Sequence, residues 1–341
     1  MRIAFEGVSY SYSDPERQKK RNKRNERRRE AGVIEESPSL KSHGKADWGS
    51  DPEAIWALHD ISFTLQDGEF LGVAGHTGSG KSTLIQHMNG LLHPTCGRVL
   101  LDGQDLADKE VAQACRGKVG LVFQYPEQQL FAATVREDVA FGPKNLGVPE
   151  EEIDERVRRA LADVQLDVDE VGDASPFELS GGQQRRVAFA GVLAMEPQVL
   201  VLDEPVAGLD PAAREEFLGL IAALHEGGRG VVMVSHDMDG LARLSDRILV
   251  LNGGEQFALG TPAEVFARGD ELRAIGLDVP APQKLACELR EEDFALDRGL
   301  YDTASLADDI AALYRSAAGG GDDEGGVAAG AAGEEAARDG R

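Results

Sequence analysis

Hydrophobic and polar residues alternate from Arg2 to Tyr12, and this period of two predicts a β-strand. Between Ile55 and Leu251, short apolar runs alternate with stretches of helical spacing. Several runs are apolar throughout, which is typical of strands in a sheet that helices cover on both faces. The pattern predicts an α/β core, with further strands expected at Ala57–Leu65, Glu69–Ala74, Arg98–Leu101, Val119–Phe123, Val199–Leu202, Val231–Ser235 and Arg247–Leu251.

The strand pattern disappears between Glu127 and Arg186. Helical spacing replaces it at Glu150–Val164 and at Glu178–Met195, so we expect a helical subdomain, about residues 126–186, inserted into the core. Beyond the core, the turn at Gly260–Pro262 precedes a short helix. That helix is expected at Ala263–Arg268, and a later amphipathic helix carries an apolar stripe of Leu306, Ile310, Leu313 and Tyr314.

Two segments lack the apolar residues that a core needs. Within residues 13–53, the stretch from Arg17 to Glu30 holds nine Lys or Arg and two Glu, a net charge of +7. We expect a disordered basic loop there, and the alternative is a contact with anionic lipid headgroups. Residues 317–341 are rich in Gly, Ala and acidic residues and are expected to form a flexible acidic tail.

Composition narrows the class of protein. The net charge of the 341 residues is -24, which disfavours a nucleic-acid partner because such binding needs clustered Lys and Arg. Cys96, Cys115 and Cys287 are widely spaced, so neither a disulfide framework nor a zinc site is expected. No apolar run approaches the ~20 residues that span a bilayer, and the first residues lack a signal-peptide pattern. We therefore expect a cytoplasmic chain whose partners would supply any membrane part.

A glycine-rich loop, GHTGSGKST, follows the strand expected at Glu69–Ala74 and precedes a helix expected at Lys81–Asn89. It fits the pattern G-x-x-x-x-G-K-[ST], in which backbone N–H groups cradle phosphates at the positive end of a helix. Lys81 is expected to bind the β- and γ-phosphates, Ser82 to bind Mg²⁺, and Thr83 to reach the α-phosphate. The side chain of His76 stays unassigned, because the loop acts through its backbone; the nucleotide-binding residues expected here are Gly75, His76, Thr77, Gly78, Ser79, Gly80, Lys81, Ser82 and Thr83.

A second motif, VLVLDEP, ends a buried strand with two carboxylates. Asp203 is expected to hold Mg²⁺ through water, and Glu204 to polarise the water that attacks the γ-phosphate. The alternative is that the acidic pair caps a helix beginning at Pro205. A third motif, LSGGQQ, lets Ser180 cap a helix whose first backbone N–H groups, at Gly181 and Gly182, would form a second anion site.

The LSGGQQ motif resembles the signature of ATP-binding cassette (ABC) ATPases, and the resemblance extends over Ile3–Phe266. It implies a P-loop NTPase (RecA-like) fold with an antiparallel β subdomain, the inserted helical signature subdomain and a small C-terminal helical extension. Glu204, His236 and Lys81 would be catalytic, and Gln124 would join Ser82 and Asp203 at Mg²⁺. Further nucleotide contacts implied by the resemblance are Tyr12 (with Tyr10 as a competitor for adenine), Gln124, Ser180, Gly181, Gly182, Gln183 and Asp210.

Residues Gly120–Gly147 and Val187–Pro211 are similar to the ATPases of energy-coupling factor (ECF) transporters, most of all to the second of their two ATPase subunits. This resemblance implies a peripheral ATPase on the cytoplasmic face of the cell membrane. Its partners would be a second ATPase (a sister chain or a second copy), a transmembrane coupling subunit and a substrate-binding membrane subunit. Residues 1–270 would form the ATPase domain, and residues 271–316 an extension that helps the two ATPases to pair.

The resemblance implies ATP and Mg²⁺ as ligands, and uptake of a vitamin or similar micronutrient as the function. The alternatives are a cobalt or nickel importer, which shares the chemistry, and a non-transport cassette ATPase. The coupling subunit would dock near Gln124–Phe141, which carries Tyr125 and Phe131. The chain departs from the family pattern at Val206, where Thr is usual, and at the basic segment after Tyr12.

Overall fold

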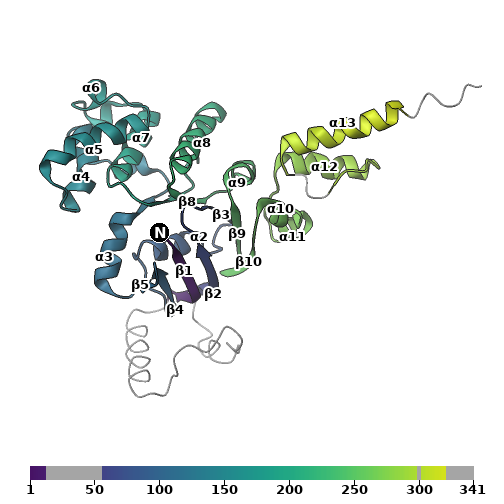
Figure 1. The fold of residues 1–341 in the computed structure, drawn as a ribbon, viewed down its shortest axis with the longest axis horizontal. Helices are drawn as coiled ribbons and strands as arrows, with labels where there is room; N and C mark the ends of the chain where they lie inside the picture. Colours follow the sequence, from purple (N-terminus) through teal and green to yellow (C-terminus); the bar gives the residue numbers. More distant parts are fainter. Residues whose placement is uncertain (13–55, 298–300, 320–341) are drawn as a thin grey trace, which may run out of the picture.

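The computed structural model describes residues 1–12, 56–297 and 301–319. The expected basic loop and acidic tail lie almost entirely outside these residues. Figure 1 shows two sheets at the centre, a lobe of helices on one side and a pair of long helices that project on the other. No helix in the described part of the chain is long and apolar enough to cross a bilayer.

A four-stranded antiparallel sheet has the order β2-β1-β4-β5. Its strands are β1 (Ile3–Ser11), β2 (Trp56–Leu65), β4 (Cys96–Leu101) and β5 (Gln104–Asp105). β1 and β2 remain paired at their ends, where Ser11 lies opposite Trp56. The predicted antiparallel subdomain is therefore present.

A six-stranded sheet has the order β10-β9-β3-β8-β7-β6. Neighbouring strands are parallel except for β10, which runs antiparallel to β9 at the edge. β3 and β8 are buried along their whole length, as their unbroken apolar sequences predict. The strands are β3 (Phe70–Gly75), β6 (Val119–Val122), β7 (Val199–Asp203), β8 (Gly230–Val234), β9 (Arg247–Asn252) and β10 (Glu255–Gly260).

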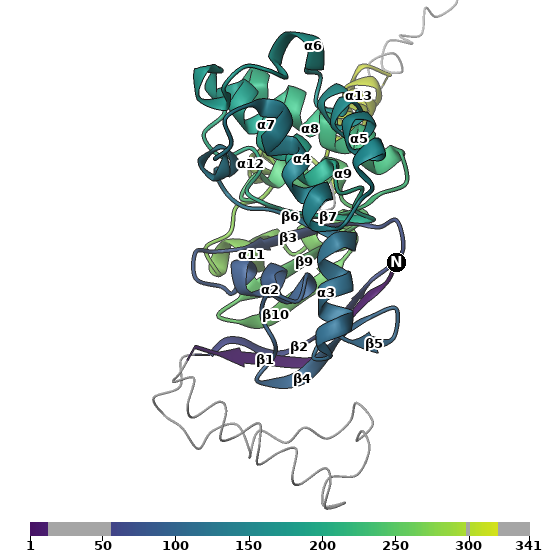
Figure 2. The same cartoon turned by 90° about the vertical axis from the view of Figure 1, so that its left-hand side faces the viewer.

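The two faces of the six-stranded sheet contribute to separate hydrophobic clusters. Figure 2 shows α2 (Lys81–Met88) between the two sheets, with α3 (Lys109–Lys118) beside it. Leu84, Ile85 and Met88 of α2 fill the cluster between the sheets together with apolar residues of β1–β4. The opposite face is covered by α8 (Pro211–Glu226), α9 (Met238–Leu244) and the helical lobe. This layering confirms the predicted P-loop NTPase architecture.

The helical lobe contains α4 (Val135–Asn145), α5 (Glu150–Asp163), α6 (Val168–Val171) and α7 (Gly181–Leu193). The prediction of one helix over Glu178–Met195 was wrong at both ends. A short 3-10 turn, η2 (Pro176–Glu178), comes first, and α7 begins only after Ser180. Ser180 and Gln183 form a reciprocal capping box that fixes this start.

The C-terminal part of the described chain is helical, with α10 (Pro262–Phe266), α11 (Gly269–Ala274), α12 (Ala281–Glu291) and α13 (Thr303–Gly319). Leu277 and Val279 belong to the large core cluster, so packing against the ATPase core continues past residue 270. α12 and α13 share a small cluster of their own. Of the predicted α13 stripe, Leu306 is buried there, whereas Tyr314 is 75% exposed.

Candidate functional site

The predicted motifs meet because they follow neighbouring strands of one sheet. Gly75 ends β3, Asp203 ends β7, and His236 lies two residues after β8. Since β3, β8 and β7 are adjacent and parallel, their carboxyl ends lie at one edge. Open α/β sheets bind ligands at this edge.

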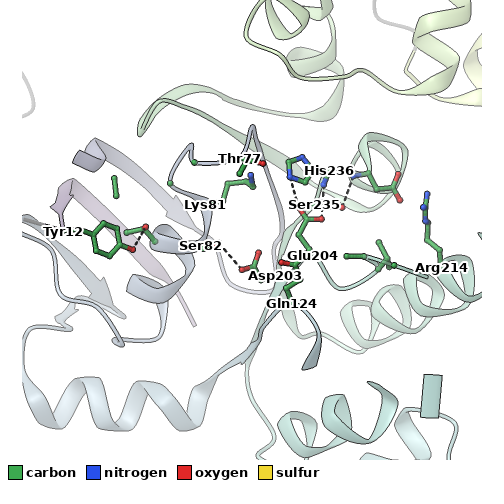
Figure 3. Close-up of a pocket in the computed structure, with 18 of the residues that line it drawn as sticks. Tyr12, Thr77, Lys81, Ser82, Gln124, Asp203, Glu204, Arg214, Ser235 and His236 are labelled. Carbon is green, nitrogen blue, oxygen red and sulfur yellow. Dashed lines mark hydrogen bonds and ion pairs between the residues drawn. The ribbon is translucent and has the colours of Figure 1, made fainter. Parts of the chain in front are cut away.

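A pocket of about 770 Å³ opens at this edge. Figure 3 shows it extending from Tyr12 at one end, past Lys81, Asp203 and Glu204, to Arg214 at the other. Of the predicted site residues, it is lined by Tyr12, Thr77, Gly78, Gly80, Lys81, Ser82, Thr83, Gln124, Asp203, Glu204 and His236. The others, which lie outside this lining, are Gly75, His76, Ser79, Ser180, Gly181, Gly182, Gln183 and Asp210.

The glycine-rich loop requires glycine on steric grounds. Gly80 has φ +100°, and a Cβ there would lie 2.3 Å from the carbonyl oxygen of Ala57. At Gly75 a Cβ would lie 2.3 Å from Oγ of Ser79. The left-handed backbone of Gly80 ends the loop and starts α2 at Lys81. The loop thereby directs backbone N–H groups at the positive end of a helix, as phosphate binding needs.

The side chain of Lys81, the first residue of α2, folds back onto the glycine-rich loop. Its Nζ donates hydrogen bonds to the carbonyl oxygens of Gly75, at 2.6 Å, and His76, at 3.1 Å. Burial lowers the pKa of Lys81, and the nearby carboxylates of Glu204 and Asp203 partly offset that effect. The ammonium group is therefore held between the loop backbone and the acidic end of β7.

Ser82 and Asp203 come from different motifs and are in direct contact. Oγ of Ser82 donates to Oδ2 of Asp203 over 3.2 Å (Figure 3). Burial raises the pKa of Asp203, while the hydrogen bond from Ser82 and the charge of Lys81 lower it. A hydroxyl and a carboxylate are the kinds of oxygen ligand that Mg²⁺ uses beside phosphates. These two residues fit the binding of Mg²⁺.

Glu204 faces His236 across the pocket (Figure 3). Its carboxylate is 3.2 Å from Nε2 of His236 and accepts a 3.3 Å hydrogen bond from the backbone N–H of the same residue. Burial raises the pKa of Glu204 and lowers that of His236. A half-buried carboxylate with a raised pKa is suited to accept a proton.

The backbone of Glu204 is unusual. Its φ is +51°, in the left-handed region that glutamate seldom adopts. No helix follows directly, because the chain passes through a turn before α8 begins at Pro211. The alternative that Asp203 and Glu204 cap a helix at Pro205 was therefore wrong. Strain of this kind at a pocket is a pointer to function.

Tyr12 and Tyr10 occupy different environments. The hydroxyl of Tyr12 lies 2.9 Å from Oγ1 of Thr83, and the ring is 57% exposed at the mouth of the pocket. Tyr10 packs edge-on against His87 and its pKa is raised by burial. These positions favour Tyr12 over Tyr10 for contact with an adenine ring at this end of the pocket. Trp56 also lines the pocket, and the sequence motifs gave no signal for it.

The signature residues Ser180, Gly181 and Gly182 lie apart from the pocket lining. Ser180 caps α7, and a Cβ added at Gly181 or Gly182 would meet nothing within 4 Å, so both residues face open space. They are exposed at the N-terminus of α7. The carboxylate of Asp210 accepts from the N–H groups of Ala212 and Ala213 and so caps α8, and its expected contact with the nucleotide stays a prediction.

Sequence reasoning missed several residues that line the pocket beside the motifs. Val206, Ala207 and Gly208 lie in the turn after β7, and Arg214 lies on the first turn of α8. Ser235 and Asp237 flank His236. Val206, Ala207 and Gly208 fall within the stretch Val187–Pro211 that is similar to ECF ATPases, and for the others proximity to the motifs was the available signal.

Known proteins resemble this chain in sequence and in fold. A profile of the ABC transporter family matches residues 58–207. The chain is 55% identical over 263 residues to the energy-coupling factor transporter ATP-binding protein EcfA2 of Symbiobacterium thermophilum, covering 77% of this chain and 90% of the relative. It is 50% identical to EcfA2 of Clostridium perfringens, covering 76% and 92%.

Two solved structures share the fold. CbiO1 from Clostridium perfringens, described as part of the ABC transporter complex CbiONQ, superposes with a TM-score of 0.61 at 33% identity and covers 80% of this chain and 93% of its own. The dimeric cassette MJ0796, in a post-hydrolysis state bound to ADP and Pi, superposes with a TM-score of 0.58 at 26% identity, covering 76% and 98%.

Proposed function

The chain belongs to the ABC transporter family, and within it to the ATP-binding proteins of energy-coupling factor importers; from this premise we propose how its residues use ATP and with which partners. As a member of this family it binds ATP and couples ATP hydrolysis to transport.

One observation carries the proposed residue roles. Lys81, the Ser82–Asp203 pair and the Glu204–His236 pair lie along one pocket in the order that a triphosphate and its attacking water need. Lys81 would contact the β- and γ-phosphates. Ser82 and Asp203 would hold Mg²⁺, which would neutralise charge on the phosphates. Gln124, from the segment after β6, lines the same pocket and would sense the γ-phosphate.

Hydrolysis would proceed by in-line attack of water on the γ-phosphorus. Glu204 would accept a hydrogen bond from this water and take its proton as the new P–O bond forms. The bond between the β–γ bridging oxygen and the γ-phosphorus then breaks, and ADP and phosphate leave. His236, 3.2 Å from the carboxylate, would hold Glu204 and the γ-phosphate in place.

The exposed signature half-site supports a head-to-tail dimer. Ser180 and the first N–H groups of α7 face solvent and lie outside the pocket of their own chain. In a dimer they would close over the γ-phosphate held by the partner ATPase. The partner would be a second ECF ATPase or another copy of this chain, with α12 and α13 as an additional pairing surface.

The membrane partners would dock on the helical lobe. Phe131 and Phe141 are 57% and 50% exposed and pack edge-to-face with ring centroids 4.8 Å apart. They follow Gln124 closely, so a transmembrane coupling subunit bound there would respond to the γ-phosphate. The chain would then lie on the cytoplasmic face of the membrane, and a third, substrate-binding subunit would select a vitamin or similar micronutrient.

Co-purification tests the assembly, and metal dependence tests the site. A tagged full-length chain expressed with its source membranes should co-purify with a second ATPase and with hydrophobic membrane proteins. In that assembly, Ser82→Ala should raise the Mg²⁺ concentration for half-maximal ATP hydrolysis roughly tenfold, the effect of losing ~1.4 kcal/mol of binding. An unchanged Mg²⁺ requirement refutes the metal assignment, and the absence of membrane partners refutes the transport role.

A further inference from the structure

One buried arginine connects three segments that are distant in the sequence: the signature helix α7, the turn that contains Glu127, and the turn after β7. Arg185 lies on α7, five residues after the cap Ser180, and is only 6% exposed. Its Nε and one terminal nitrogen, Nη2, bind both carboxylate oxygens of Glu127, at 3.1 and 3.2 Å. Its other terminal nitrogen, Nη1, donates to the carbonyl oxygens of Ala207, at 3.0 Å, and Pro205, at 3.5 Å.

The partners of Arg185 lie beside two residues of the proposed ATP site, Gln124 and Glu204. Glu127 belongs to η1 (Pro126–Gln129), the 3-10 turn that starts two residues after Gln124. Pro205 and Ala207 form the turn that directly follows Glu204. The guanidinium therefore fixes the signature helix to the Gln124 segment and to the strained turn at Glu204.

Arg185 makes more hydrogen bonds than the neutralisation of its charge by Glu127 requires. A carboxylate alone would neutralise the arginine, yet two backbone carbonyls of one short turn also accept from it. Four of the five guanidinium N–H groups are used, in a fixed planar fork that lysine cannot reproduce. Replacing a buried ion pair by apolar residues is often neutral for stability, so stability by itself does not require this arrangement.

We propose that Arg185 is a positioning residue that sets the signature helix relative to Glu204 and Gln124 of the same chain, and so links the two ATP sites of the dimer. The inference rests on the proposed function, in which Glu204 serves the chain's own ATP and Ser180 serves the ATP of the partner. A shift of the turn at Pro205 then moves the signature helix, and closure of the signature helix moves the turn.

The test uses the assembled ATPase pair with Arg185→Lys and Glu127→Gln. Lysine keeps the charge of Arg185 and glutamine keeps the shape of Glu127, so each breaks the two-bond pairing of guanidinium and carboxylate with little change in volume. The matched control is Arg186→Lys on the next position of α7, where the side chain binds Glu216 at 3.0 Å and the carbonyl oxygen of Val164. Arg186 ties α7 to α8 and to the end of α5 through Glu216 and Val164, and neither of these residues lines the pocket.

Three quantities are measured. The ATP dissociation constant of the isolated chain reports its own half-site and should stay within twofold of wild type. The kcat of the assembled pair should fall roughly tenfold in both variants, equal to ~1.4 kcal/mol. ATP-dependent association, measured by sedimentation with hydrolysis blocked by Glu204→Gln, should weaken about tenfold as well. Arg186→Lys should leave all three unchanged.

Two results overturn the inference. One is wild-type kcat and association in both variants, even if their melting temperatures fall. The other is an equal loss in Arg186→Lys, which would report general loosening of α7. A wild-type pair without ATPase activity would instead refute the proposed function, and the inference with it.

Discussion

Replacing Glu204 by glutamine separates the activity of this site from its stability. Glutamine has nearly the same shape, so the hydrogen bond from the N–H of His236 to the side chain can remain. The change removes the negative charge and with it the ability to accept a proton from water. It leaves φ at +51° and the surrounding turn as they are.

The expected loss of activity follows from the chemistry. A positioned general base contributes about 10²–10⁴-fold to a rate, which is roughly 3–5 kcal/mol of transition-state stabilisation. The kcat of the Glu204→Gln site should therefore fall at least 100-fold, while the ATP dissociation constant stays within a few-fold because Lys81 and the loop are unchanged.

Stability should change in the opposite direction. Burial raises the pKa of Glu204 in the folded chain, whereas the unfolded chain keeps the usual value of 4.5. The stabilising contribution is therefore present below pH 4.5 and is lost as the pH rises through the folded pKa. At pH 7 the neutral glutamine avoids this loss, and we expect a higher Tm than that of the wild type.

The assay is phosphate release by the assembled pair, in which the catalytic glutamate of the partner ATPase has already been replaced, so that all turnover comes from this chain. Thermal unfolding at pH 4 and pH 7 gives the stability. Glu215→Gln is the matched control, because Glu215 is exposed and pairs with Arg243 on the surface. Turnover within tenfold of wild type would refute the base assignment, and a lower Tm at pH 7 would refute the pKa argument.

Three further outcomes follow from the geometry. Gly80→Ala should lower the free energy of unfolding, measured in urea, by more than about 2 kcal/mol, because left-handed strain of ~1–2 kcal/mol adds to a 2.3 Å clash. Gly78→Ala has φ +82° and open space around it, so it should lower the free energy of unfolding by the strain alone. Burial lowers the pKa of His87 from 6.5 to about 4, so its stabilising effect is present above pH 6.5 and is lost as the pH falls to 4. Replacing it by leucine should remove roughly 3 kcal/mol of the pH dependence between those values, and an unchanged dependence contradicts the buried neutral form. Tyr12→Ala should raise the ATP dissociation constant about 5- to 100-fold through the loss of ~1–3 kcal/mol of stacking, while Tyr10→Ala should lower the Tm with little effect on ATP; the reverse pattern would transfer the adenine contact to Tyr10.

The sequence predicted the core strands well because their residues are buried. β3 and β7 begin or end within one residue of the expected bounds, and the motif at the end of each is placed as expected. β5 and β10 were missed. β5 has only two residues, both exposed, and β10 is an edge strand whose side chains are mostly half-buried, so neither shows an apolar alternation.

Motif spacing predicted eleven of the residues that line the pocket, but neither the other lining residues nor the contacts that support them. The Ser82–Asp203 contact follows from the order of parallel strands, which the alternation of elements implies. The roles of Arg185 and Trp56 could not be predicted, because neither lies in a motif. Their positions depend on where η1, the turn after β7 and the end of β1 meet in three dimensions. Asp210 was assigned to the nucleotide by resemblance, and this assignment stays a prediction; the sequence did not indicate that its carboxylate also caps the start of α8.

The left-handed backbone at Glu204 has a consequence for directed evolution of this protein toward higher yield or heat resistance. Glycine and asparagine tolerate positive φ at little cost, and neither leaves a charge in a half-buried pocket. A library screened for yield or heat resistance alone would therefore enrich these two residues at position 204. With Glu204 as the proposed general base, such clones would express better but hydrolyse ATP at least 100-fold more slowly, so a screen of this chain must score turnover in every round.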